Sequence, residues 1–290
     1  MIDVKMIGKL LNFEAIKMNG RRITWVPFIV LAAVVVLIVL VFHRLQFKHP
    51  REIFNSFGVA ISKKEDFVNG YYLAAHAMNP VFQLLIPIFI AVASGLMVAG
   101  EAEHGTLRAC LIRPVRRRDL LLGKFAILSG YSLALCVFFL VLVAIAGIAN
   151  FGVGNLYTIN VLFNNGEMGA STIPENEVPM RFVMAGMIAT LGMMVLAALA
   201  LMISALVETA AMAYVLTLSV YFTVLTLRVF PALDWLYPYL FVSHMMRWQQ
   251  CFYSHVRMGE IYVSLVHQAC YLVAFLSAAV LLFNEKDIKT

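Results

Sequence analysis

The sequence predicts an all-α membrane protein with six transmembrane helices, and three observations lead to this fold class. The chain is 62% hydrophobic and only 13% charged, with a mean hydropathy of +0.87, whereas soluble domains are about half apolar and a quarter charged. Six segments have about 20 residues without Asp, Glu, Lys or Arg, which is enough for a helix to cross a ~30 Å hydrocarbon core. Positive charge is concentrated in two of the segments outside these runs.

The six expected spans define the domain organisation. They are residues 23–42, 81–100, 125–151, 182–207, 209–227 and 261–283. Only Glu208 separates the fourth from the fifth, which indicates a tight helical hairpin. The first run is followed by His43 and Arg44 instead of a small-residue cleavage site, so we expect it to be an anchor and not a signal peptide. Together, residues 23–283 form one membrane domain, followed by a tail at 284–290.

The charge distribution predicts the orientation. Residues 101–124 carry six basic residues and residues 1–22 carry five, whereas the three long loops together carry only nine in about 100 positions. Dense positive charge marks cytoplasmic segments. We therefore expect both termini in the cytoplasm, with the topology determined by Arg116, Arg117, Arg118 and Lys124.

The N-terminal segment has the pattern of an amphipathic helix. Apolar residues alternate with charged ones at helical spacing, namely Ile7, Leu10, Leu11 and Phe13 against Lys5, Lys9, Glu14 and Lys17. Such a helix would lie at the cytoplasmic interface with its lysines near lipid headgroups. The alternative is a disordered basic tail.

Several function classes find little support. The net charge is +6, but the sequence has no basic stripe interleaved with aromatic residues, so we expect no nucleic-acid partner. The histidines and four cysteines lack metal-ligand spacing. No phosphate-binding loop is present, because Gly123-Lys124 is followed by Phe125, and we expect no cofactor in this chain.

A membrane-embedded serine hydrolase is one alternative. Ser94 lies in Ala93-Ser94-Gly95, and His267 lies within the sixth expected span. A catalytic pair would need hydrogen-bond contact and an oxyanion site. Small residues such as Gly95 more often allow helices to pack closely, so we expect no catalytic residues.

The segment 101–124 is the most informative loop. Read as one helix ended by Pro114, it places Leu107, Cys110 and Leu111 on one face, suited to a groove on a partner. Glu101, His104 and Arg108 fall on another face. The plainer interpretation is a positive cluster that keeps the loop in the cytoplasm. That interpretation leaves Glu101 and Glu103, at the end of an apolar span, unexplained.

This loop resembles that of the ABC-2 type permease family, which has a G-E-…-G-T-L-…-P-…-R-…-G-K segment after its second span. The matching positions are Gly100, Glu101, Gly105, Thr106, Leu107, Pro114, Arg117 or Arg118, Gly123 and Lys124. The end of the chain, Phe283-Asn284-Glu285-Lys286-Asp287-Ile288, is similar to the family's F-x-x-[RK]-D-I. One departure is the moderately long loop 43–80, which leaves the substrate subclass open.

The resemblance implies a multi-pass permease of the cytoplasmic membrane, most simply an exporter, that pairs with a second permease copy or a related permease. Two cytoplasmic ATPase subunits would bind Mg-ATP and dock on the loop. The implied partner-coupling residues are Glu101, Gly105, Thr106, Leu107, Arg108, Leu111 and Pro114. The remaining alternative is a membrane anchor that recruits a cytoplasmic complex.

Overall fold

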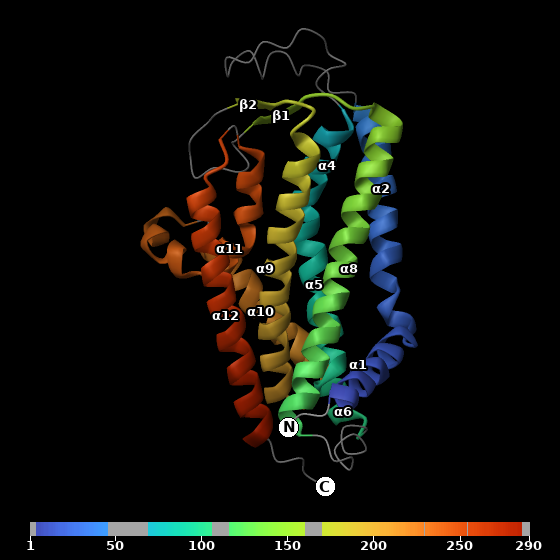
Figure 1. Cartoon of the computed structure of the whole chain (residues 1–290), viewed down its shortest axis with the longest axis vertical. Helices are drawn as coiled ribbons and strands as arrows, with labels where there is room; N and C mark the ends of the chain where they lie inside the picture. The colour runs from blue at the N-terminus through green and yellow to red at the C-terminus, as the bar shows by residue number, and fades with distance from the viewer. Residues whose placement is uncertain are drawn as a thin grey trace.

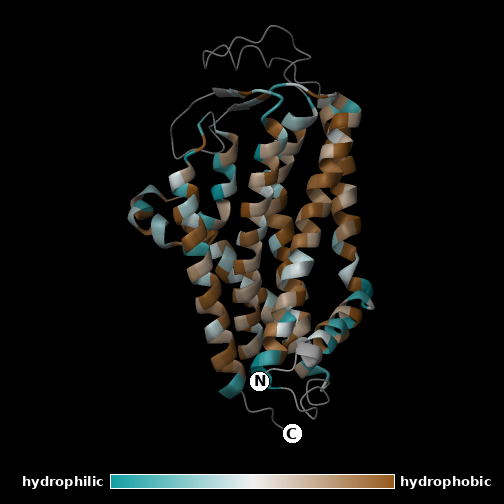
Figure 2. Ribbon diagram, in the orientation of Figure 1, coloured by the Kyte–Doolittle hydropathy of each residue, from teal (hydrophilic) through white to brown (hydrophobic). Residues whose placement is uncertain are grey.

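The computed structural model describes residues 4–45, 69–105, 116–159, 170–228, 230–253 and 255–285. Within them, six helical segments are long and apolar enough to cross a membrane (Figures 1 and 2), which confirms the predicted helical membrane fold. They are Arg22–Arg44, Gly70–Glu103, Arg117–Phe151, Val178–Leu206, Ala210–Leu227 and Met258–Glu285. One end of the bundle holds α6 (Ala99–Glu103) and the start of α8 (Arg117–Phe151), and we call it the loop end (Figure 1). The opposite end holds the strands β1 (Leu156–Ile159) and β2 (Ala170–Ile173), and we call it the hairpin end.

The chain enters the bundle through a corner at the loop end. Helix α1 (Val4–Asn19) lies obliquely there and is joined by the 3-10 turn η1 (Arg22–Thr24) to α2 (Val26–Leu45) (Figure 1). The Thr24 hydroxyl donates to the Met18 carbonyl at 2.6 Å, and the Trp25 indole donates to the Asn19 carbonyl at 3.1 Å. These bonds satisfy carbonyls at the end of α1 and fix the angle between the two helices.

The second helical segment is interrupted twice. It consists of α4 (Gly70–Pro80), the π-helical turn η2 (Val81–Leu85), α5 (Ile86–Met97) and the short α6 (Ala99–Glu103). The expectation that residues 70–80 belong to an outer loop is wrong. Asn69 caps this helix by accepting a hydrogen bond from the Tyr72 amide at 2.9 Å, and the π turn accommodates Pro80 inside a continuous helical path.

The other four spans contain their predicted segments almost entirely and mostly extend beyond them. They are α8 (Arg117–Phe151), α9 (Val178–Leu206), α10 (Ala210–Leu227) and α12 (Met258–Glu285). Polar residues at their ends continue the helix toward water, which an apolar window does not detect. Helix α9 is central and packs against α5, α8, α10 and α12, while α2 lies at the edge (Figure 1).

Two small features complete the hairpin-end half. Strands β1 (Leu156–Ile159) and β2 (Ala170–Ile173) pair antiparallel, with Leu156 opposite Ile173 and both residues buried. The aromatic segment before α12 forms the short helices η4 (Pro231–Tyr239), α11 (Phe241–Met245) and η5 (Met246–Phe252). Its first part exposes Trp235, whereas its last part buries Trp248 against Phe82 of the second span.

Candidate functional site

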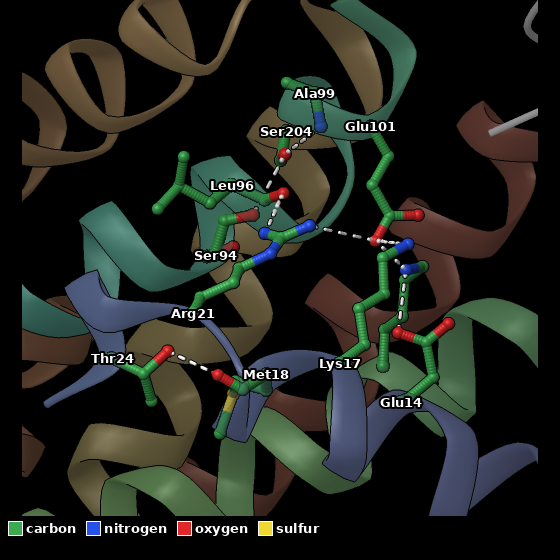
Figure 3. A network of polar contacts seen from close by, with 11 residues as sticks. Glu14, Lys17, Met18, Arg21, Thr24, Ser94, Leu96, Ala99, Glu101 and Ser204 are labelled. Atoms are coloured by element: carbon green, nitrogen blue, oxygen red, sulfur yellow. Dashed lines mark hydrogen bonds and ion pairs between the residues drawn. The ribbon is translucent and has the colours of Figure 1, made fainter. Parts of the chain in front are cut away.

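Five charged side chains meet at the loop end and form what we call the ion-pair cluster: Glu14, Lys17, Arg21, Glu101 and Lys124 (Figure 3). The ammonium of Lys124 contacts Glu14 Oε2 at 3.0 Å and Glu101 Oε1 at 2.8 Å. The same Glu101 oxygen lies 2.7 Å from Lys17 Nζ and 3.8 Å from the Arg21 guanidinium. The cluster thus joins α1, α6 and α8.

The centre of the cluster is buried. Lys124 is 1% exposed and both carboxylates are 2% exposed, whereas Lys17 and Arg21 are 24% and 33% exposed. Charges removed from water are tolerated only with partners, and removal of one partner of a buried pair costs about 3–5 kcal/mol. Three cations face two carboxylates, which leaves one excess positive charge. That excess lies on the two side chains that still reach the surface.

A break between α5 and α6 directs Glu101 into the cluster. The Ser204 hydroxyl of α9 accepts a hydrogen bond from the Ala99 amide at 3.0 Å and lies 3.3 Å from the Ser94 carbonyl (Figure 3). The Arg21 guanidinium donates to the Leu96 carbonyl at 3.1 Å. A side chain inserted into the backbone ladder of a helix produces a kink. The helix therefore turns after Met97 and carries Glu101 toward α1 and α8.

Close approach of α1 to α8 depends on Gly123. A Cβ atom at this position would lie 3.1 Å from Leu10 Cδ2, closer than side chains normally pack. The glycine beside Lys124 therefore has a packing role. The structure also corrects the predicted polar and apolar faces of α1. Glu14 is buried against α8, whereas Phe13 is 43% exposed. The polar residue faces inward because Lys124 is there to pair with it.

The loop leaves α6 at Gly105, and this changes the predicted docking helix. Gly105 has φ +68°, and its amide donates to the Ala102 carbonyl at 3.0 Å. A left-handed residue just after a helix ends it, so a single helix running from Glu101 to Pro114 is wrong. The predicted coupling residues Thr106, Leu107, Arg108, Leu111 and Pro114 lie outside the described residues.

Two further charged residues of the loop contact other spans. A Glu103 carboxylate oxygen accepts from the Ala210 amide at 3.0 Å, which places negative charge at the start of α10, where the helix dipole favours it. Arg117 donates to the carbonyls of Phe283 and Asn284, at 3.4 and 3.1 Å, at the end of α12. Arg116 and Arg118 are exposed. The loop's base is therefore tied to α1, α10 and α12.

The structure places Ser94 and His267 in opposite halves of the bundle. Ser94 lies beside the kink near Glu101 (Figure 3). His267 hydrogen-bonds the Val263 carbonyl at 2.8 Å and stacks on His244, with ring centroids 4.4 Å apart. Gly95 allows α5 and α10 to pack closely, since a Cβ there would lie 2.9 Å from the Ala210 carbonyl oxygen of α10. These contacts favour helix packing over a catalytic pair.

His244 has a polar environment of its own at the start of α12. Its Nδ1 lies 3.1 Å from the Ser264 hydroxyl, and its Nε2 lies 2.9 Å from the Pro238 carbonyl. Burial lowers the pKa of His244, and the nearby His267 and Arg247 lower it further, against the opposing effect of the Pro238 carbonyl. His244 therefore has a structural role, because its hydrogen bonds hold η4 against α12.

Sequence reasoning missed the grouping of Glu14, Lys17 and Arg21 with Glu101 and Lys124. One signal was present, since Glu101, at the end of an apolar span, lacked an explanation. A carboxylate in that position favours a cation nearby. The residues that the structure describes contain no group of three or more His, Cys, Asp or Glu side chains that could hold a metal ion.

Comparison with known families gives a match over residues 30–289 to the family described as "Protein of unknown function (DUF2705)". No curated protein matches the chain.

Proposed function

The chain belongs to DUF2705, a family of unknown function. From the resemblance of its loop and tail to the ABC-2 type permease family, we propose that it is the transmembrane permease subunit of an ABC-type transporter, energised by a separate ATPase. The substrate would cross the cytoplasmic membrane, most simply outward. The ATPase subunits would bind Mg-ATP and dock at the loop end.

The observation that carries this proposal is the position of the ion-pair cluster at the base of the loop. Glu101 precedes the loop and Lys124 follows its return into α8, and the two side chains lie 2.8 Å apart. Both also contact α1. A partner that presses on the loop would therefore move α1, α6 and α8 together, because separating their buried charges is costly. A coupling segment of a transporter needs such a connection.

Exposed apolar faces support a pairing with a second permease. Ile29, Val36 and Leu37 of α2 are each more than half exposed, as are Met212 and Val215 of α10. Both helices flank α5. Lipid or a second copy would cover these faces. Because α9 occupies the centre of one bundle, the transport path would run between two copies.

The experiment is a comparison of two aspartate substitutions of equal charge. Leu107→Asp places a charge on the loop segment that we propose for docking, and Val153→Asp places one at an exposed position near the hairpin end. We expect the tagged wild-type chain and the Val153 variant to co-purify with a subunit that carries ATPase motifs and hydrolyses ATP. We expect the Leu107 variant to reach the membrane but to lose that subunit.

Other outcomes identify the alternatives. A loop-dependent partner without ATPase motifs would indicate a membrane anchor. Cleavage of a reporter peptide by the purified chain, abolished by Ser94→Ala, would indicate a hydrolase. Equal ATPase association of the Leu107 and Val153 variants would remove the loop from the docking surface.

A further inference from the structure

A cavity opens beside the ion-pair cluster and has two chemically different ends. It lies between α1, α2 and α5, with a volume of about 250 Å³. The side chains of Glu14, Lys17, Arg21 and Glu101 line one end. The rest of the lining is almost entirely apolar and includes Val26, Phe89 and Val92.

The charged end has donors to spare. Lysine carries three N–H donors and arginine five. Among the described residues, Lys17 contacts Glu101 at 2.7 Å, while Arg21 donates to the Leu96 carbonyl and lies 3.8 Å from Glu101. Both cations are partly exposed, whereas the carboxylates behind them are buried. The lining therefore holds two cations and two carboxylates, and the two cations are the more exposed of these four charged groups.

The apolar end has the dimensions of part of an acyl chain. Along α5, the lining runs from Leu96 back to Ile88, which at ~1.5 Å per residue is roughly 12 Å. The neighbouring face of α2 continues outward with Ile29, which is 68% exposed. The cavity thus extends from the loop end of the spans toward their middle.

In a membrane, the charged end of the cavity would lie at headgroup depth. Arg21 and Trp25 are at the corner between α1 and the first span, and the indole of Trp25 is half exposed. Trp and Arg concentrate at this level of a membrane. A cation pair at headgroup depth above an apolar channel suits an anionic amphiphile and not a free ion.

We propose that this cavity binds one anionic phospholipid, with its phosphate between Lys17 and Arg21 and an acyl chain between α2 and α5. The inference rests on the membrane placement of the six helices and is independent of any ATPase partner. A bound lipid would add a contact between α1 and α5 next to the ion-pair cluster, so it would stabilise the loop-end arrangement.

The test is lipid retention by the full chain in detergent, measured by native mass spectrometry with dioleoyl phosphatidylglycerol and dioleoyl phosphatidylcholine. We expect one phosphatidylglycerol to be retained at a concentration at which phosphatidylcholine is not. Lys17→Gln with Arg21→Gln should weaken phosphatidylglycerol binding by at least about tenfold, since each surface cation contributes appreciably to anionic lipid affinity. Arg116→Gln with Arg118→Gln removes the same charge outside the cavity and should leave binding unchanged.

A second variant protects the test against misfolding. Ala93→Phe fills the apolar part of the cavity and leaves the ion pairs intact, and it should also weaken phosphatidylglycerol binding. Equal binding of both lipids, equal loss in the Arg116/Arg118 variant, or full binding by the Ala93 variant would overturn the proposal. Displacement of the lipid by millimolar inorganic phosphate would do the same, because it would show a phosphate site in place of a lipid site.

Discussion

At residue scale, Lys124 illustrates how context changes the meaning of a charge. In the sequence it is one of several basic residues that predict a cytoplasmic loop. In the structure it is 1% exposed and contacts two carboxylates, Glu14 and Glu101. A lysine that only marked the topology would be solvated. Lys124 instead holds α1 against α8.

Replacing Lys124 with Met should lower the free energy of unfolding by about 3–5 kcal/mol, because Glu14 would keep a buried charge without its ion pair. Adding Glu14→Gln should restore part of the loss, since Glu101 would still face Lys17 and Arg21. Unfolding in mixed micelles, followed by circular dichroism, provides the measurement. Arg118→Met is the matched control, because Arg118 is 48% exposed and surface pairs contribute at most about 1 kcal/mol. A Lys124 variant as stable as the control would show that the cluster is not energetically coupled.

At the scale of elements, helix pairs meet where side chains are smallest. Gly70 of α4 and Gly147 of α8 touch through their backbones, since a Cβ on Gly147 would lie 2.7 Å from the Gly70 carbonyl oxygen. The Gly70 amide also donates to the Gly152 carbonyl at 2.9 Å. The hairpin ends of α4 and α8 are therefore held together by direct backbone contact.

The substitution Gly147→Ala should destabilise the protein by about 1–3 kcal/mol, the usual cost of overpacking. Gly130→Ala lies in the same helix but at a position where an added Cβ meets no atom within 4 Å. This control should be neutral or stabilising by up to about 1 kcal/mol, because alanine favours helix over glycine. Thermal unfolding of the two variants compares them directly, and equal stability would contradict the close contact.

The elements also show what the sequence could and could not predict. The spans followed from runs of apolar residues, because a bilayer imposes that composition. The kink between α5 and α6 beside Ser204, the inward position of Glu14 and the end of α6 at Gly105 depend on contacts between segments up to 110 residues apart or on a single backbone angle. No local pattern encodes them. Glu101 and Glu103 were recognisable as anomalies, but only the structure shows that their partners are internal.

At the scale of the whole molecule, the two ends of the bundle differ in charge. Among the described residues, the loop end carries the exposed Arg116 and Arg118 and the partly exposed Arg21 and Lys17, whereas the hairpin end carries the β1–β2 pair. Basic residues near helix ends stay in the cytoplasm. The orientation with the loop end in the cytoplasm stays a prediction, and it can be tested by labelling.

A cysteine at position 116, in a chain whose native cysteines are replaced by alanine, should be shielded from an impermeant thiol reagent in intact cells. A cysteine replacing the exposed Thr172 of β2 should label readily. Both should label after the membrane is opened, which controls for reactivity. The reverse pattern in intact cells would place the loop outside and remove the basis for a cytoplasmic partner.

The contact between Glu103 and α10 bears on how the protein is made. Residues 207–209 leave almost no chain between α9 and α10, so the two helices form a tight helical pair. The first amides of a helix have no acceptor within their own helix. The Glu103 carboxylate accepts from the Ala210 amide, 107 positions further along the chain. A segment that the ribosome makes early therefore provides an acceptor for a helix that it makes late.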